Sequence, residues 1–128
     1  MRVGTSLISV GMLHLVVGLV QYATQLREIA HAGIIAAVGD FGDRAAAFWF
    51  LITSFPLLLL GLCALDLEQR GLTLPRALAP GLCVLALVIV VPMPQSGGWL
   101  FFVTAWLAQR SRARLTSVQA APSRLRAR

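Results

Sequence analysis

A histidine in the middle of an apolar stretch is the residue of this sequence best suited to chemistry. His14 and Thr53 each lie eight residues inside an apolar run, so we expect them to share a depth if the runs pair as antiparallel helices. An ionisable group in such a place is a functional candidate that can move a proton or bind a ligand. In the alternative interpretation, a hydrogen bond from His14 to Thr53 or Ser54 serves only as a link between helices.

Charged residues gather between the first two apolar runs, over residues 23–44. One hypothesis makes this segment a charged vestibule that leads past Gln21 toward His14. The other makes it a solvated cap with an ion pair of little energetic value. The candidate pairs are Arg27–Asp40 and Arg44–Glu28. The apolar part of this outer loop, 29–38, is too short to span a bilayer, and we expect it to lie in the membrane interface.

The pattern of residues does not indicate catalysis or metal binding. The sequence contains no nucleophile–base pair, no phosphate-binding glycine loop and no carboxylate pair. A redox or haem protein is a weaker third alternative, because a haem held by two histidines needs a second histidine at the depth of His14, and the only other one, His31, falls in the outer loop. Cys63 and Cys83 lie inside apolar runs without a CxxC motif, which is typical of packing residues. We therefore expect no enzyme activity, no metal and no cofactor.

The composition indicates the elements that position these residues. Of the 128 residues, 58% are hydrophobic and 12% are charged. Soluble domains are less apolar and carry about 25% charged residues, and so small a body has too little interior to bury this apolar surface. The sequence thus predicts an integral membrane protein that is all-α, a bundle of four transmembrane helices.

Four apolar runs define one domain, residues 1–109, with helices expected at 3–22, 45–67, 74–91 and 95–109. Pro56 should kink the second helix. The apolar part of the fourth run is short, so its alternative is an interfacial or re-entrant segment. Residues 110–128 form an arginine-rich tail, which we expect to be disordered.

The arginines predict the topology. All eleven basic residues are arginine, and the formal net charge is +6. With four crossings and both termini in the cytoplasm, nine arginines lie inside and two, Arg27 and Arg44, lie outside, as the positive-inside rule requires. We expect the tail to contact anionic lipid headgroups and not nucleic acid. The location expected is the inner (plasma) membrane.

Two stripes of small residues predict how the first two helices pack. Each stripe repeats every seven residues, with Gly4, Gly11 and Gly18 in the first helix and Ala47, Ser54 and Gly61 in the second. Antiparallel pairing places Gly18 near Ala47, Gly11 near Ser54 and Gly4 near Gly61. Small residues let membrane helices approach closely, so we expect this pair to pack most tightly.

Two short motifs carry a family resemblance. The segment 11–18, in which His14 stands between two glycines, is followed by Arg44 and the aromatic run 48–50. Both resemble a family of small uncharacterised bacterial four-helix integral membrane proteins. The resemblance implies a bacterial inner membrane, four spans and some importance for His14 and Arg44.

The function that follows is binding without catalysis. We expect a small multi-pass membrane protein that holds a lipid or protein partner, with a second copy of the chain as one candidate partner. The alternative is a small transporter or channel, which would have to dimerise to enclose a polar pathway near His14. The small multidrug transporters are similar in size but rely on a glutamate in the first helix. This chain has His14 at that level, so proton-coupled export is a poor match to its sequence.

Overall fold

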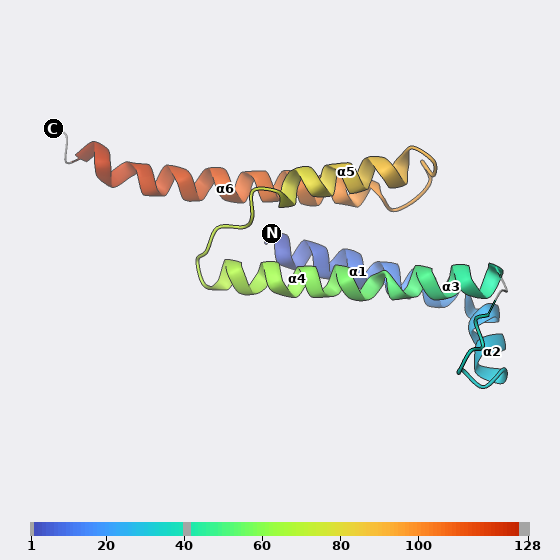
Figure 1. The fold of residues 1–128 in the computed structure, drawn as a ribbon. Helices are drawn as coiled ribbons and strands as arrows, with labels where there is room; N and C mark the ends of the chain where they lie inside the picture. The colour runs from blue at the N-terminus through green and yellow to red at the C-terminus, as the bar shows by residue number, and fades with distance from the viewer. Residues whose placement is uncertain (1, 40–41, 126–128) are drawn as a thin grey trace. The chain divides into compact units, whose positions relative to one another are not determined.

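The computed structural model describes the backbone of residues 2–39 and 42–125 and the side chains as far as Ala113. Six helices make up this part of the chain, and it contains no strand (Figure 1). Their bounds are α1 Val3–Gln21, α2 Ala23–His31, α3 Gly42–Ile52, α4 Ser54–Gln69, α5 Leu78–Val90 and α6 Trp99–Leu125. The protein is therefore all-helical, as the sequence predicts.

The second apolar run forms two helices. α3 ends at Ile52 and α4 begins at Ser54, with Thr53 in a turn between them. Pro56 accounts for the interruption, because it has no N–H for the carbonyl of Ile52 and its ring crowds that carbonyl. The sequence places a kink at Pro56 itself, whereas the break comes three residues earlier, on the side where the proline acts.

Glycines with positive φ end two of the helices. Gly33 (φ +94°) follows α2, and Gly71 (φ +69°) follows α4. After α2, the N–H of Ile34 donates to the Ile29 carbonyl and that of Gly33 to the Ala30 carbonyl, each at 3.2 Å. This pair of bonds is the Schellman arrangement, which requires a left-handed residue that glycine adopts without steric cost.

The last two helices differ from their expected bounds. α5 begins at Leu78, so Pro75 precedes it and Pro80 lies in its first turn, where no helical partner needs the missing N–H. α6 begins at Trp99 and continues to Leu125, through a segment for which we expected disorder. Alanine, arginine, leucine and glutamine are good helix formers and are frequent there. Arg110 also lies 4.0 Å above the Trp106 ring, one turn earlier.

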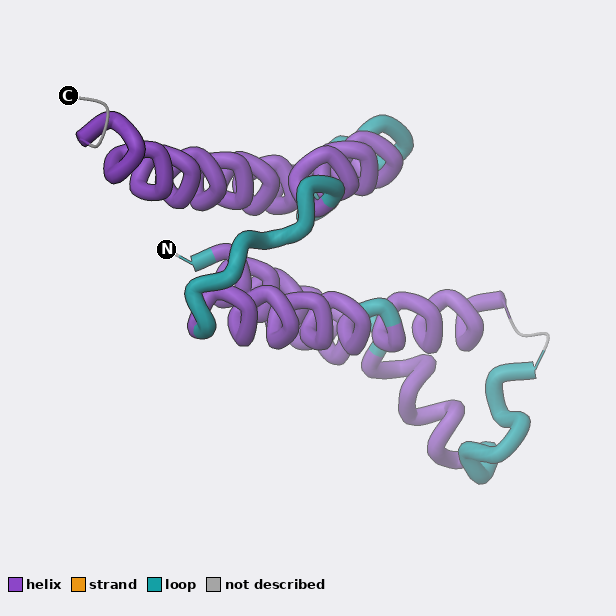
Figure 2. Tube along the Cα trace, turned by 60° about the vertical axis from the view of Figure 1, so that its left-hand side comes forward, coloured by secondary structure: helices purple, strands orange, loops and turns teal. Residues whose placement is uncertain are grey.

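The chain divides into two compact units. One holds residues 7–60, that is α1 from Leu7 onward, α2, α3 and the first part of α4. The other holds the residues up to Ser6 and those from Gly61 onward, with the end of α4, α5 and α6. The tube view shows the loops before and after α5 as breaks between the helices (Figure 2).

Glycines set the close approaches in the unit of residues 7–60. A Cβ added to Gly11 would lie 3.0 Å from Leu58 Cδ2, and one added to Gly18 would lie 2.7 Å from Leu51 Cδ2. Leu7, Ala47 and Ser54 are fully buried beside them, each 0% exposed. Here α1 packs against α3 and the first part of α4 through small residues that admit leucine side chains.

The other unit has a glycine contact of the same kind and a separate helix pair. A Cβ on Gly4 would come within 2.6 Å of Leu65 Cα, so the α1 backbone lies directly on that of α4. α5 and α6 run alongside each other, and Gly98 leaves room for Ile89 and Val90. Buried residues at helical spacing line this pair: Ala79, Leu82, Ala86 and Val90 on α5, and Phe101, Thr104, Ala105 and Ala108 on α6.

The register of the small-residue stripes differs from the expected one. Gly18, Gly11 and Gly4 contact Leu51, Leu58 and Leu65, four residues beyond Ala47, Ser54 and Gly61. All six stripe residues are buried. Small residues therefore face leucines instead of each other, because a leucine fills the space that a glycine leaves and gains dispersion contacts.

Candidate functional site

His14 and Phe50 form the centre of the candidate site, within the unit of residues 7–60. His14 Nε2 lies 3.0 Å from the backbone carbonyl oxygen of Phe50. The two rings are stacked, with centroids 4.0 Å apart and an interplanar angle of 18°. A carbonyl oxygen can only accept, so Nε2 carries the proton and donates it. Nδ1 is then the nitrogen that can accept from a further group.

The partner of His14 is a backbone group, not the side chain of Thr53 or Ser54. A helical carbonyl points four residues toward the C-terminus, so the Phe50 oxygen lies near the level of Thr53 and Ser54. The expected depth is thus correct to within a turn. The Thr53 hydroxyl is exposed and donates to the carbonyl of Trp49 at 2.7 Å, which removes Thr53 from the site.

Aromatic and small residues enclose the stacked pair. The Tyr22 ring is tilted against Phe50, with centroids 5.3 Å apart. A Cβ on Gly18 would lie 2.9 Å from Phe50 Cδ1. Gly18 therefore leaves the space in which the Phe50 ring lies between His14 and Tyr22. Phe50 belongs to the aromatic run 48–50, which stands out in the sequence, but neither Phe50 nor Tyr22 was predicted to contact His14.

Two polar side-chain atoms in the unit of residues 7–60 are buried without a hydrogen-bond partner among the described residues. They are Ser54 Oγ, in a residue that is 0% exposed, and Gln25 Oε1. Gln21, which the sequence suggests as a step toward His14, is exposed at the end of α1. The polar residues therefore do not form a continuous ladder.

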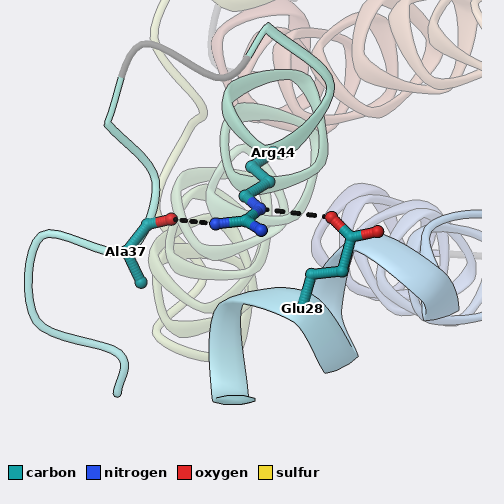
Figure 3. Close-up of polar contacts among 3 residues, drawn as sticks. All are labelled: Glu28, Ala37 and Arg44. Carbon is teal, nitrogen blue, oxygen red and sulfur yellow. Dashed lines mark hydrogen bonds and ion pairs between the residues drawn. The ribbon is translucent and has the colours of Figure 1, made fainter. Parts of the chain in front are cut away.

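Arg44 connects three segments at the loop end of the same unit (Figure 3). Its Nε lies 3.2 Å from Glu28 Oε2, and its Nη1 donates to the Ala37 carbonyl at 3.2 Å. These contacts join α3 to α2 and to the loop between them. Of the two expected ion pairs, Arg44–Glu28 is present, and Arg27–Asp40 involves a residue outside the described part of the chain. The arrangement is a clasp across the loop more than an open charged vestibule.

The unit with α5 and α6 holds a carboxylate cap that the sequence did not reveal. Glu68 Oε1 accepts from the N–H of Val3 at 2.8 Å, and Oε2 accepts from that of Gly4 at 3.1 Å. These donors have no partner within α1, and a negative charge is favourable at a helix N-terminus. The signal was the absence of a capping side chain before Val3, but nothing in the sequence specifies a partner 65 residues away.

A buried pair of hydroxyls lies in the same unit. Ser6 Oγ and Thr104 Oγ1 are 3.0 Å apart, and both residues are buried. The Thr104 hydroxyl donates to the carbonyl of Leu100 at 2.9 Å, so Ser6 is the donor to Thr104. Such hydrogen bonds join helices without introducing charge.

The chemistry available to the site is that of one imidazole. Among the described residues, no group of three or more histidine, cysteine or acidic side chains could hold a metal ion. Cys63 and Cys83 are free thiols. A neutral imidazole with one nitrogen engaged can exchange a proton or accept one hydrogen bond.

The helical fold and the apolar composition of its helices define the class of protein. This is an all-helical protein with two helical stretches long and apolar enough to cross a membrane, Val3–Gln21 and Gly42–Gln69, within the described residues. The chain belongs to a family of unknown function, DUF6463, whose model matches residues 1–115. Comparison with curated proteins finds no match, and comparison with solved structures finds none either.

Proposed function

We propose that the chain is a multi-pass integral membrane protein of the inner membrane that binds lipid or a partner protein without catalysis. The observation that carries the proposal is the exposure of apolar side chains. Only 33% of the apolar window in Val3–Gln21 and 22% of that in Gly42–Gln69 is buried. A core helix of a soluble protein buries most of such a window, whereas a helix in lipid does not need to.

The exposed side chains are large and continuous along the helices. They include Met12, Leu13, Val16, Val17 and Val20 on α1, Phe55, Leu59 and Leu62 on α4, and Val84, Leu87 and Val88 on α5. Contiguous apolar surface of this extent is rare on monomeric soluble proteins and marks contact with a membrane or a partner. A bilayer accounts for it on three helices at once.

In the proposed topology the chain crosses four times, with α1, then α3 with α4, then α5, then α6. α5 has 13 residues and rises only ~20 Å, so it spans only with help from flanking residues or local bilayer thinning. α6 has 27 residues, and its first turns carry the apolar sequence. Both termini then lie in the cytoplasm, which gives the nine-to-two arginine bias.

The proposed ligands follow from the surface chemistry. The apolar faces of α1, α4 and α5 contact acyl chains or a second copy of this chain. On α6, Arg110 lies over Trp106 where the apolar part of the helix ends. Tryptophan and arginine are favoured at the level of lipid headgroups. We therefore assign anionic headgroups to this end of α6 and to the arginines that follow.

Native mass spectrometry in mild detergent tests this proposal. We expect the wild-type chain to enter the membrane fraction, resist an alkaline wash and retain phosphatidylglycerol over phosphatidylcholine. An Arg110→Gln/Arg112→Gln variant should retain several-fold less anionic lipid, and the matched outer-loop variant Arg27→Gln should not. Extraction of the wild-type chain into plain buffer would overturn the membrane assignment. Liposome flux that disappears in His14→Ala would instead support the transporter alternative.

A further inference from the structure

Two isoleucines project from the turn that follows α2. Ile34 is 72% exposed and Ile35 is 90% exposed. They belong to the unit of residues 7–60, and the described part of that unit provides no cover for them. Leaving two such side chains in water forgoes about 1.5–3 kcal/mol of burial each. A surface of this kind at a loop tip indicates an external contact.

The backbone holds these side chains outward at a conformational cost. Ile34 has φ +67°, and the N–H of Ile35 donates to the Gly33 carbonyl at 2.7 Å, which closes a three-residue turn around Ile34. Ala36 also has a positive φ, +56°. For a β-branched residue a left-handed conformation is an outlier, and such outliers persist only where the surroundings fix them.

The surroundings fix the turn from both sides. The N–H of Ile34 donates to the Ile29 carbonyl in the cap of α2, and the N–H of Ala37 donates to the Ile34 carbonyl at 3.3 Å. Arg44 then holds the Ala37 carbonyl and Glu28 together. Ala37 is itself buried. The isoleucines are therefore presented by a braced segment.

The position of the turn indicates what covers it. α2 turns away from the direction of α1 and α3, which lie alongside each other (Figures 1 and 2). Leu26 and Ile29 are half-buried, whereas Thr24, Arg27, Glu28 and His31 are exposed. Beside membrane-spanning helices, a helix with a charged exposed face suits the membrane interface, where that face meets headgroups and water. Tyr22, between α1 and α2, and Trp49 on α3 are aromatic residues of the kind that favours the same level.

We propose that the Ile34–Ile35 turn is an anchor that inserts into the boundary between headgroups and acyl chains of the adjacent leaflet. The occupant of the apolar tip is lipid, because α1 and α3, the helices before and after this segment, expose apolar side chains such as Val20 and Trp49. This inference rests on the proposed membrane function, since it needs α1 and α3 to span. Insertion would set the depth of α2 and of the Arg44–Glu28 clasp beside it.

Fluorescent labelling of single cysteines tests the anchor. In a background with Cys63→Ala and Cys83→Ala, three variants carry an environment-sensitive label: Ile35→Cys, Arg27→Cys and Val16→Cys. Each is reconstituted into phosphatidylcholine vesicles and quenched with aqueous iodide or with lipids that bear a nitroxide near the headgroup or near the chain end. Arg27 is the matched control, because it lies in the same loop on the same side of the membrane.

The expected result separates the anchor from the span. The label at Ile35 should emit at shorter wavelength than that at Arg27, show several-fold weaker iodide quenching and respond most to the shallow nitroxide. The label at Val16 should respond most to the deep nitroxide. If Val16 is in lipid while Ile35 is as open to iodide as Arg27, the anchor is wrong and the span stands.

Two further outcomes would also overturn the anchor. Protection of Ile35 from iodide without nitroxide quenching means that protein covers the tip. An aqueous signal at Val16 removes the proposed function and the anchor together. Ile34→Asn provides a second readout, since asparagine tolerates a positive φ. It should preserve the fold in detergent while the label at Ile35 becomes several-fold more accessible to iodide.

Discussion

At the scale of single residues, His14 contributes through the backbone of a neighbouring helix. Its imidazole donates to the Phe50 carbonyl and stacks on the Phe50 ring, and neither contact uses the Thr53 hydroxyl. The histidine therefore links α1 to α3 whether or not it has a further role. A role in proton exchange would use Nδ1, which leaves the link intact.

Replacing His14 with alanine should lower the free energy of unfolding by about 1–2 kcal/mol, because an interhelical hydrogen bond and a ring stack are lost together. Thr53→Ala is the matched control at the same level. It should change stability little, since that exposed hydroxyl bonds only to the Trp49 carbonyl in the preceding turn of α3. Thermal unfolding in a mild detergent measures both. An equal or larger loss in Thr53→Ala would contradict the assignment.

Two buried serines should respond in opposite directions to alanine. Ser54 Oγ is buried without a partner among the described residues, so Ser54→Ala should raise the free energy of unfolding by about 1 kcal/mol.

Ser6 donates to Thr104, so Ser6→Ala should lower the free energy of unfolding by about 1 kcal/mol. Chemical unfolding in detergent compares the two. Destabilisation by Ser54→Ala would show that its hydroxyl has a partner, for instance a water molecule.

At the scale of elements, the distance from each glycine to the neighbouring helix decides whether a larger side chain fits there. A methyl group at Gly4 would meet the backbone of Leu65, which cannot move without shifting α4. At Gly11 it would meet the Leu58 side chain, which has rotamers to adopt, at 3.0 Å and the Leu58 backbone nitrogen only at 3.2 Å. Gly81 in α5 has nothing within 4 Å of the added carbon. The three positions form a graded series.

We expect Gly4→Ala to lower the free energy of unfolding by about 3 kcal/mol and Gly11→Ala by less, because overpacking against backbone is the more costly case. Gly81→Ala is the control and should be neutral or stabilise by up to about 1 kcal/mol, since alanine is the better helix former. Unfolding midpoints in detergent give the order. A Gly81→Ala variant as damaged as Gly4→Ala would exclude the close-approach explanation.

The elements also show what a sequence of this kind can and cannot specify. Hydropathy places α1 within one residue and predicts the second run, and Pro56 predicts that the run is interrupted. The seven-residue stripes identify buried small residues, yet their register is four residues off. Spacing within one helix is set by helical geometry, whereas register between helices depends on how leucines fill the space above glycines.

The candidate site was harder to predict for the same reason. His14 stands out as a polar group in an apolar helix, but its partner is a main-chain carbonyl, which every residue carries and no sequence pattern marks. The Glu68 cap joins groups 65 residues apart. The Arg44–Glu28 ion pair could be predicted, because opposite charges in one short loop have few other partners with which to pair.

At the scale of the whole molecule, the charges and the apolar surface support one arrangement. In the proposed four-crossing topology, the loop over residues 23–44 carries two of the eleven arginines, and the other nine lie in segments on the opposite side of the membrane. With Arg2 in the cytoplasm, an odd number of crossings would place the six arginines from Arg110 onward outside, against the positive-inside rule. The parity of the crossings therefore decides on which side of the membrane the arginine-rich tail lies.

Reporter fusions measure that parity directly. A fluorescent protein that matures only in the cytoplasm should be bright when fused after Arg128, and a phosphatase active only outside should be inactive there. The same phosphatase inserted after Gly33 should be active, because that glycine lies in the outer loop. Replacing Arg110 and Arg112 with glutamine should weaken the signal without reversing it, since Arg2, Arg70 and Arg76 still favour the cytoplasm. Phosphatase activity after Arg128 as well as after Gly33 would mean an odd number of crossings. The helix to remove from the list of spans is then α5, because at 13 residues it is the shortest of the four proposed crossings. Activity after Arg128 without activity after Gly33 would mean that the whole topology is inverted.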